Sequence, residues 1–573
     1  MICKCQAGNR GNTGFDSLIC QRHYSEPLFR KSFMSKQLDL LDIQGHVLRA
    51  YGRFSYPKAR YVFLNIRHSG RARRFVDAIT QRVTTAVCWG KGPNDMPPPE
   101  WAVNIAFTYQ GLKELELPRA SLIGFSPEFV EGMKHRKDIL GDDGPSAPEH
   151  WDPIWRDNRE TRDKDVHIFI ALNALAPVKS ESALTDIQQA MAQCDVFLEQ
   201  AYAWLLDEVK KSEAGVVILG GNRGDDGALL DYQEVKVVME NGMPTAKEHF
   251  GYTDGIGDPV FEGVPYDEAR VRGRGKQMAD GSWAPLATGE FLLGHIDEAQ
   301  EYPPAPRPIL LARNGTYMVY RKLHENVASF DKYLRQEGQK YPGGEELLAA
   351  KFVGRWRDNG APLVSAPDAE SKKKFDEKFA QASLAEQDRM LSDFTYDNDM
   401  SGAKCPFSAH LRRINPRASL EMGRDPGDIP GSYKTITGAF DTPGALSNRR
   451  RILRRGLPYG EVKDRSRDDG NHGIIIMMLN ADINRQFEFV QQQWVNYGND
   501  FKAGNDKEII LGNHSHDPRF ASKAVLQVDP ASEEVPYILS NIPRFVETRG
   551  GEYFFIPSMT ALRMIARGVI DPT

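Results

Sequence analysis

Gly473-Ile-Ile-Ile-Met-Met-Leu479 is a short run of β-branched and other apolar residues. The run is too short for a membrane helix, which needs about 20 apolar residues. Its length and its β-branched residues predict a buried strand. After it, apolar residues recur at the i, i+4, i+7, i+11 spacing of one helix face, at Ile483, Phe487, Val490 and Trp494. Asp482 stands where it can cap that helix. A strand that leads directly into a helix indicates an α+β unit.

The same alternation of strands and helices extends outward through the chain. Residues 315–320 are predicted to form a strand, and residues 325–337 a helix. In the first half, the expected strands are 60–66, 101–107 and 165–172, and the expected helices are 72–87, 109–115 and 186–211. This pattern predicts a sheet with helices packed against it, in two similar α+β halves that meet near residues 251–257.

Length and charge exclude several classes of protein. The chain of 573 residues carries a net charge of -5, which gives no electrostatic bias toward nucleic acid or anionic membranes. We therefore expect a soluble protein with neither as a partner. Residues 1–36 are expected to be a flexible leader, and they lack the apolar core of a secretory signal. A cytoplasmic location is expected, and secretion stays open. The six cysteines are too dispersed for a disulfide framework and are read mostly as small core residues of a reducing compartment.

Three polar segments carry the residues that suit chemistry. In Phe250-Gly-Tyr-Thr-Asp-Gly-Ile-Gly-Asp-Pro259, glycines flank Asp254 and allow both tight turns and the close approach of a flat ligand. An Asp-Gly pair is also the usual mark of an ordinary turn, so this segment alone decides nothing.

The other two segments are basic. Cys405-Pro-Phe-Ser-Ala-His-Leu-Arg-Arg-Ile-Asn-Pro-Arg417 places one histidine beside three arginines. A single imidazole is a sufficient axial ligand for haem iron, and guanidinium groups bind carboxylates bidentately. A basic surface turn is the alternative. Asn448-Arg-Arg-Arg-Ile-Leu-Arg-Arg-Gly-Leu-Pro-Tyr-Gly460 could be a nucleic-acid patch or a helix end, but the chain is acidic overall and this segment lacks interleaved aromatic residues.

Together the three segments resemble the dye-decolorizing peroxidase family, in its large-chain branch. Gly251-Tyr-Thr-Asp-Gly255 matches the Gly-x-x-Asp-Gly motif of the family, and 405–417 is similar to its proximal-histidine segment. The stretch Arg454-Arg-Gly-Leu-Pro-Tyr-Gly460 matches the pattern around its distal arginine. The motif order is preserved, and the resemblance covers about residues 37–568.

The resemblance implies an α+β fold of two ferredoxin-like domains, antiparallel sheets with flanking helices, which enclose one non-covalent haem b. The domains would span residues 37–255 and 256–573. No Cys-x-x-Cys-His sequence is present, so covalent attachment of c-type haem is excluded. The implied activity is a haem peroxidase that uses hydrogen peroxide to oxidise dyes, phenolic or other bulky organic reductants through a ferryl intermediate. A monomer or a homodimer is expected.

Residue roles follow from the matched motifs. His410 would be the axial iron ligand, Asp254 the distal proton relay and Arg454 the group that stabilises O–O cleavage. A carboxylate base stays ionised to lower pH than histidine, so we expect an acidic activity optimum. Arg412 and Arg417 would bind haem propionates, and Gly255 would lie against the haem. Gly456 stands where some relatives carry an asparagine.

Several assignments stay open at this point. Asp482 and Glu488 are candidates for an acidic partner of His410, although helix capping explains Asp482 more simply. Met477 and Leu479 could form an apolar distal wall or belong to the core. Trp494 and Tyr497 are candidates for electron relays to bulky reductants.

Two histidine features and three other functions also remain. His514-Ser-His516 could bind a metal, and His249 could tune the pocket, although ordinary structural roles are more common for both. The rival functions are a chlorite dismutase-like haem enzyme, a haem carrier without enzymatic activity, and a nucleic-acid binder. The first is disfavoured because that family lacks the distal aspartate.

Overall fold

The computed structural model describes residues 37–570 except 53–54, 91–95, 157–161, 178–183, 267, 279, 421–443, 516, 518 and 520–521. The leader expected at residues 1–36 lies outside this part. The first half of the chain forms a unit of β1 (Lys58–Ile66), α2 (Ser69–Thr80), β2 (Trp101–Phe107), β3 (Ile168–Ala174), α7 (Leu184–Lys211) and β4 (Val216–Ile218). Its antiparallel strands are ordered β2-β3-β1-β4, and β7 (Gln233–Lys236) also pairs with β1. This β-α-β-β-α-β arrangement is ferredoxin-like.

The second half repeats this topology around β12 (Thr316–Glu325), α10 (Val327–Gly338), β13 (Leu453–Tyr459), β14 (Gly473–Asn480) and β17 (Val546–Ile556). The strand order is β13-β14-β12-β17, again antiparallel throughout. Two π-helical segments, Asn484–Glu488 and Val490–Val495, take the place of the second crossover helix. As predicted, Asp482 caps this helix, because its Oδ1 accepts a hydrogen bond from the Arg485 amide at 2.9 Å.

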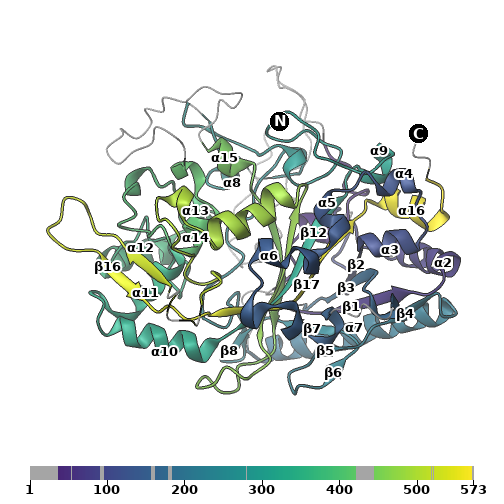
Figure 1. Ribbon diagram of the computed structural model, residues 1–573, viewed down its shortest axis with the longest axis horizontal. Helices are drawn as coiled ribbons and strands as arrows, with labels where there is room; N and C mark the ends of the chain where they lie inside the picture. Colours follow the sequence, from purple (N-terminus) through teal and green to yellow (C-terminus); the bar gives the residue numbers. More distant parts are fainter. Residues whose placement is uncertain are drawn as a thin grey trace, which may run out of the picture.

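The two units share one sheet, which runs through the centre of the molecule (Figure 1). β17 of the second unit pairs with β2 of the first at Phe555 and Phe107. The C-terminal helix α16 (Met559–Arg567) packs against α2 of the first unit. The expected α+β fold with two ferredoxin-like units is confirmed. The division into domains at residue 255 stays a prediction.

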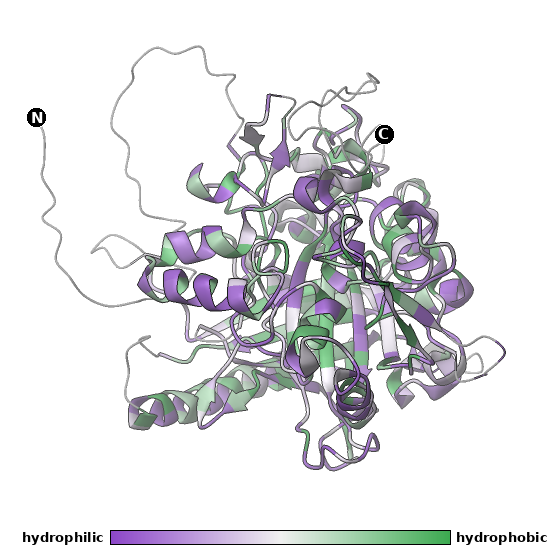
Figure 2. Ribbon diagram, turned by 90° about the vertical axis from the view of Figure 1, so that its left-hand side faces the viewer, coloured by the Kyte–Doolittle hydropathy of each residue, from purple (hydrophilic) through white to green (hydrophobic). Residues whose placement is uncertain are grey.

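Four helices lie on the outside of the second unit. They are α11 (Gly344–Val353), α12 (Ala369–Gln381), α13 (Leu384–Ser392) and α14 (His410–Ile414). In Figure 1 they lie on the side of the sheet away from α2 and α7. Figure 2 shows hydrophobic residues along the central strands and, on the outer helices, both hydrophilic and hydrophobic residues. Burial of apolar surface on both sheet faces therefore holds the units together.

The remaining elements are short. The helices are α1 (Gly45–Leu48), α3 (Tyr109–Glu114), α4 (Arg119–Leu122), α5 (Pro127–Glu131), α6 (Lys137–Leu140), α8 (Glu268–Val271), α9 (Ile309–Ala312) and α15 (Ala445–Asn448). The two-stranded pairs are β5/β6 (Asn222–Arg223, Leu229–Leu230), β8/β9 (Met239–Glu240, Met243–Pro244), β10/β11 (Lys276–Gln277, Trp283–Ala284) and β15/β16 (Lys523–Leu526, Tyr537–Ser540). Within the described residues, no helix is both long and apolar enough to cross a membrane.

Two of the expectations about local structure need correction. The helix predicted over residues 72–87 ends at Thr80, because the chain then turns to bring Thr84 alongside Val103 of β2. Cys194 and Cys405 are buried free thiols, as expected for small core residues, whereas Cys88 is disulfide-bonded.

Candidate active site

Asp254 is presented by a tight loop between β9 and α8. The loop folds back on itself through the bridge between Lys247 and Thr253, and the Asp254 amide donates to the Ala246 carbonyl at 2.7 Å. Gly251 and Gly255 both have positive φ, at 95° and 78°, a region that glycine enters without strain. The Gly255 amide donates a hydrogen bond to the Asp254 carboxylate. The glycines thus shape a turn that exposes one carboxylate.

Arg454 on β13 points at this carboxylate. Its Nη1 donates to Asp254 Oδ1 at 2.8 Å. The next residue, Arg455, points the other way because side chains alternate along a strand, and it binds Asp258 Oδ2 at 2.8 Å and the His46 carbonyl. Of the arginines in this segment, Arg454 is therefore the one that meets Asp254.

Opposing effects set the pKa of Asp254. Burial raises it, the Arg454 guanidinium and the Gly255 amide lower it, and the net result lies below the ordinary value. His410 is close enough to lower this pKa as well. The Asp254 charge in turn raises the pKa of Arg454. The pair is therefore an ionised carboxylate beside a guanidinium cation.

His410 is the first residue of α14, and its side chain is 22% exposed. Its Nδ1 lies 3.5 Å from Glu508 Oε1. Glu508 is fully buried, and its two carboxylate oxygens accept the Ile510 amide at 2.8 Å and the Leu511 amide. Such an acidic partner fixes the orientation of the ring and raises the basicity of the other ring nitrogen.

Glu508 is the acidic neighbour that sequence reasoning missed. Asp482 caps its own helix, and Glu488 pairs with Arg136 and Tyr553, so neither candidate reaches His410. The available signal was an acidic residue directly before the apolar run Ile509-Ile510-Leu511.

Apolar side chains of β14 line the same face of the sheet as Arg454. Arg454 pairs with Met478 and Gly456 with Ile476, and cross-strand partners share a face. Met478 and Ile476 are half-buried there and line a cavity together with Arg321, Leu323, Val546 and Leu511. Met477 and Leu479 point to the opposite face and belong to the main core. The apolar wall is therefore displaced by one residue from the predicted pair.

Gly456 has no room for a side chain. Its φ is 122°, and an added Cβ would lie 2.0 Å from the Ile475 carbonyl oxygen. An asparagine at this position is therefore incompatible with the pairing of β13 and β14. Any third distal polar group would have to come from another element.

The arginines near His410 have different partners. Arg412 Nη1 binds Asp399 Oδ2 at 2.9 Å and the Cys405 carbonyl at 2.8 Å, so its guanidinium already has an anionic partner. Arg413 donates to backbone carbonyls, including that of Trp494 at 2.8 Å. The structure thus gives Arg412 a structural ion pair in place of the predicted propionate contact.

Arg417 is half-buried and belongs to a cluster of guanidinium groups that also includes the buried Arg355 and Arg451. Arg417 donates to the Phe394 and Ser392 carbonyls, and within the described ranges none of the three arginines forms an ion pair with a carboxylate. Burial lowers the pKa of Arg355 to about 9, of Arg417 to about 10 and of Arg451 to about 9. Arg355 also lies near enough to Arg454 to feel its charge. Buried cations without counter-ions are costly, so this cluster suits an anionic ligand.

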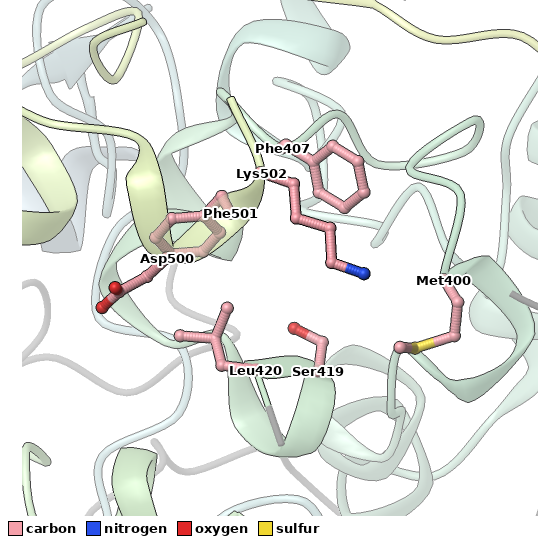
Figure 3. Close-up of a pocket in the computed structure, with 7 residues that line it drawn as sticks. All are labelled: Met400, Phe407, Ser419, Leu420, Asp500, Phe501 and Lys502. Carbon is pink, nitrogen blue, oxygen red and sulfur yellow. The ribbon is translucent and has the colours of Figure 1, made fainter. Parts of the chain in front are cut away.

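A second pocket lies beside α14 (Figure 3). It is lined by Met400, Phe407, Ser419, Leu420, Asp500, Phe501 and Lys502. The Lys502 ammonium points into it, whereas the Asp500 carboxylate points away and accepts the Trp494 Nε1–H at 2.9 Å. Trp494 is buried, and Tyr497 is 47% exposed. Their predicted relay role stays a prediction.

The remaining histidines of interest have structural surroundings. The His514 ring is buried and its Nε2 lies 3.0 Å from the Glu508 carbonyl oxygen, and His516 lies outside the described residues. Across the described part of the chain, no group of three or more His, Cys, Asp or Glu side chains could hold a metal ion. His249 packs beside His472, with its Nε2 3.1 Å from the Tyr459 carbonyl oxygen.

Known proteins of similar sequence are peroxidases, although no protein-family model matches the chain. The chain is 27% identical over 363 residues to the dye-decolorizing peroxidase msp1 of Mycetinis scorodonius, with 59% of this chain and 61% of that protein covered. It is 26% identical over 551 residues to peroxidase 2 of the same organism, with 92% and 87% covered. It is 30% identical over 356 residues to the multifunctional dye peroxidase of an Amycolatopsis species, with 58% and 64% covered.

Solved structures agree in fold over more than nine-tenths of the chain. A dye-decolorizing peroxidase in complex with 2,6-dimethoxyphenol superposes with a TM-score of 0.64 at 22% identity, with 92% of this chain and 100% of that one covered. A fungal peroxidase from Auricularia auricula-judae gives 0.62 at 20% identity, with 93% and 100% covered. In sequence and in fold, the chain is similar to the dye-decolorizing peroxidases. It is accordingly an oxidoreductase of the peroxidase class, as the sequence resemblance indicated.

Proposed function

We propose that this protein, like the dye-decolorizing peroxidases that it resembles, uses hydrogen peroxide to oxidise dyes, phenols and other bulky organic reductants. The observation that carries the proposal is the 2.8 Å pair of Asp254 and Arg454, close to His410 and on the sheet face lined by apolar residues of β14. A relative has been solved with 2,6-dimethoxyphenol, so this phenol is the first reductant to assay.

The residues present fit a haem b held without covalent bonds. His410 would hold the haem iron through its Nε2, with Glu508 beside the other ring nitrogen. The cluster of Arg355, Arg417 and Arg451 offers the cationic surroundings that two propionates need. Gly255 remains a proposed contact, because the space where its Cβ would stand is open. When bound, the haem would supply the two-electron reduction of peroxide and the one-electron oxidation of the organic reductant.

The side chains move the proton and stabilise charge. The Asp254 carboxylate is ionised, so it can accept a proton from one peroxide oxygen and return it to the other, which leaves as water. The Arg454 guanidinium stabilises the negative charge that develops on the leaving oxygen. Because the Asp254 pKa lies below its ordinary value, the base works at acidic pH, and we expect an acidic optimum.

The variants Asp254→Asn and Arg454→Leu test these roles. We expect each to slow the peroxide-induced change in the haem absorption band at least about tenfold, in line with the 10²- to 10⁴-fold typical of a general base. The rate is measured by stopped-flow absorbance on haem-loaded protein, and dye oxidation is followed in parallel.

Asp258→Asn is the matched control. Asp258 stands in the same loop, is 39% exposed as Asp254 is, and binds Arg455 at the same 2.8 Å. If Asp258→Asn slows the reaction as much as Asp254→Asn, the proton relay is wrongly assigned. A haem absorption band without any peroxide-dependent dye oxidation would instead indicate a haem carrier.

A further inference from the structure

Glu248 closes the turn that presents Asp254. Its two carboxylate oxygens accept the Phe250 and Tyr252 amides, each at 2.7 Å. The Gly251 amide also donates to the Glu248 carbonyl at 3.0 Å. The side chain and the backbone of one residue thus hold the turn two positions before the aspartate.

Glu325, at the end of β12, contacts the Glu248 carboxyl group. Glu325 is 3% exposed, and its Oε2 accepts the His249 amide at 3.2 Å. The two carboxyl groups hydrogen-bond each other, and both are near enough to Asp254 to feel its charge. Among the described residues, neither glutamate forms an ion pair with lysine or arginine.

This arrangement requires a proton between the two carboxyl groups. Two carboxylates at hydrogen-bond distance, enclosed and without a cation, cannot both be ionised. Burial accordingly raises the pKa of both carboxyl groups above the ordinary range, that of Glu325 further than that of Glu248. Glu248 accepts two amide N–H groups, which favours its charged form, so Glu325 is the group that keeps the proton.

The proton also limits the negative charge around Asp254. The other ionisable groups around the pair are Tyr252 in the loop, Tyr459 on β13 and His249. Two arginines also lie nearby, but Arg465 is paired with Asp331 and Arg357 with Glu346. Burial raises the pKa of both tyrosines and lowers that of His249, which favours the neutral form of all three, so none of these groups compensates a second charge on the pair. A doubly ionised pair would raise the pKa of Asp254 and would also lose the hydrogen bond that fixes Glu248.

We propose that Glu248 and Glu325 are positioning residues for the peroxide reaction, a carboxyl pair that shares one proton and holds the Asp254 loop in place. The proposal rests on the proposed function of Asp254. It predicts that the loop loosens when either member of the pair is lost.

The test uses the haem-loaded, full-length chain with Glu248→Gln, Glu325→Gln and Glu325→Leu. Infrared spectroscopy should show the C=O stretch of a buried protonated carboxyl group in the unaltered protein, and this band should disappear in both Glu325 variants. Glu325→Gln keeps a donor for Glu248, so amide hydrogen exchange over residues 250–252 should stay within about threefold of the unaltered protein. Glu248→Gln and Glu325→Leu should speed this exchange at least about tenfold and slow the peroxide reaction at least about fivefold.

Glu552→Gln is the control, because Glu552 also accepts two backbone amides, those of Met133 and Tyr553, each at 2.8 Å, but far from the loop. It should change neither the exchange at residues 250–252 nor the peroxide rate. A band that persists in Glu325→Gln, or exchange that stays slow in Glu325→Leu, overturns the proton-sharing pair. Faster exchange with an unchanged peroxide rate overturns the positioning role. If the pair behaves as expected and Asp254→Asn reacts normally, only the proposed function fails.

Discussion

The charge of one neighbouring residue, Arg454, has a large effect on the pKa of Asp254. Burial alone would raise its pKa, and the guanidinium of Arg454 is the largest of the effects that lower it. In Arg454→Leu the pKa of Asp254 therefore rises. A base loses activity as the pH falls through its pKa, so the acidic limb of the peroxide rate should move to higher pH, by about one unit or more. The pH profile of the peroxide reaction measures this shift, and an unmoved acidic limb would refute the electrostatic role.

The residues of the candidate active site were predictable from the sequence to different degrees. Asp254, His410 and Arg454 stand in motifs whose glycines and prolines are visible in the sequence, and the structure brings them to one region. Glu508 has no motif. Its position beside His410 depends on how the loop before it packs against α14, and that information is spread over the tertiary fold.

At the scale of elements, side chains alternate between the two faces of a strand, and only some sequences show which face each residue occupies. The strand at Gly473–Asn480 was predictable because it is continuously apolar, but the same property hides which face each residue occupies. In a strand with Ile or Met on both faces, no polar residue marks which side chains point to which face of the sheet. The pairing of Arg454 with Met478, which assigns Met478 and Ile476 to the site, appears only once β13 and β14 are in register.

Gly456 is one of the tightest points of this register. In Gly456→Ala, the new Cβ would lie 2.0 Å from the Ile475 carbonyl, so β13 must separate from β14. We expect a loss of about 3 kcal/mol of stability together with a slower peroxide reaction, because Arg454 lies two residues away. Thermal unfolding and stopped-flow rates measure the two effects.

Gly281→Ala separates crowding from backbone strain in this prediction. Gly281 also has positive φ, 81°, but nothing lies within 4 Å of its Cβ position. Gly281→Ala should lose only the stability that backbone strain at positive φ costs, about 1 kcal/mol, and should leave the peroxide rate unchanged. Equal losses in the two variants would show that contact with Ile475 is not the cause.

For the molecule as a whole, we expect acid stability to depend on three imidazoles packed where β12, β14 and the Asp254 loop meet. The rings of His249 and His324 lie 5.5 Å and 5.2 Å from that of His472. Burial, and then the charges of the other two rings, lower the pKa of His472 to about 4. The unfolded chain takes up protons below about pH 6.5 and the folded one does not. The resulting stability is complete above that pH and is lost as the pH falls toward about 4.

His472→Phe removes this proton uptake and keeps an aromatic ring. Between about pH 7 and pH 4.5, we expect the variant to lose about 2 kcal/mol less unfolding free energy than the unaltered protein. Urea unfolding at the two pH values measures the difference. His150→Phe, at an exposed position, should follow the unaltered protein. If His472→Phe follows it too, the cluster is not the cause of acid sensitivity.

The buried guanidinium cluster links cofactor binding to the stability of the whole fold. Arg355, Arg417 and Arg451 come from three separate segments, and without an anion their burial and mutual repulsion oppose folding. A ligand that binds only the folded chain stabilises it, and one that also neutralises these cations stabilises it more. Haem should therefore raise the unfolding free energy by about 2 kcal/mol more than its dimethyl ester, in which the propionates carry no charge. In Arg417→Leu this difference should shrink, because one of the cations is gone. Calorimetric unfolding with each porphyrin tests both steps, and equal stabilisation by haem and its ester would show that the cluster does not receive the propionates.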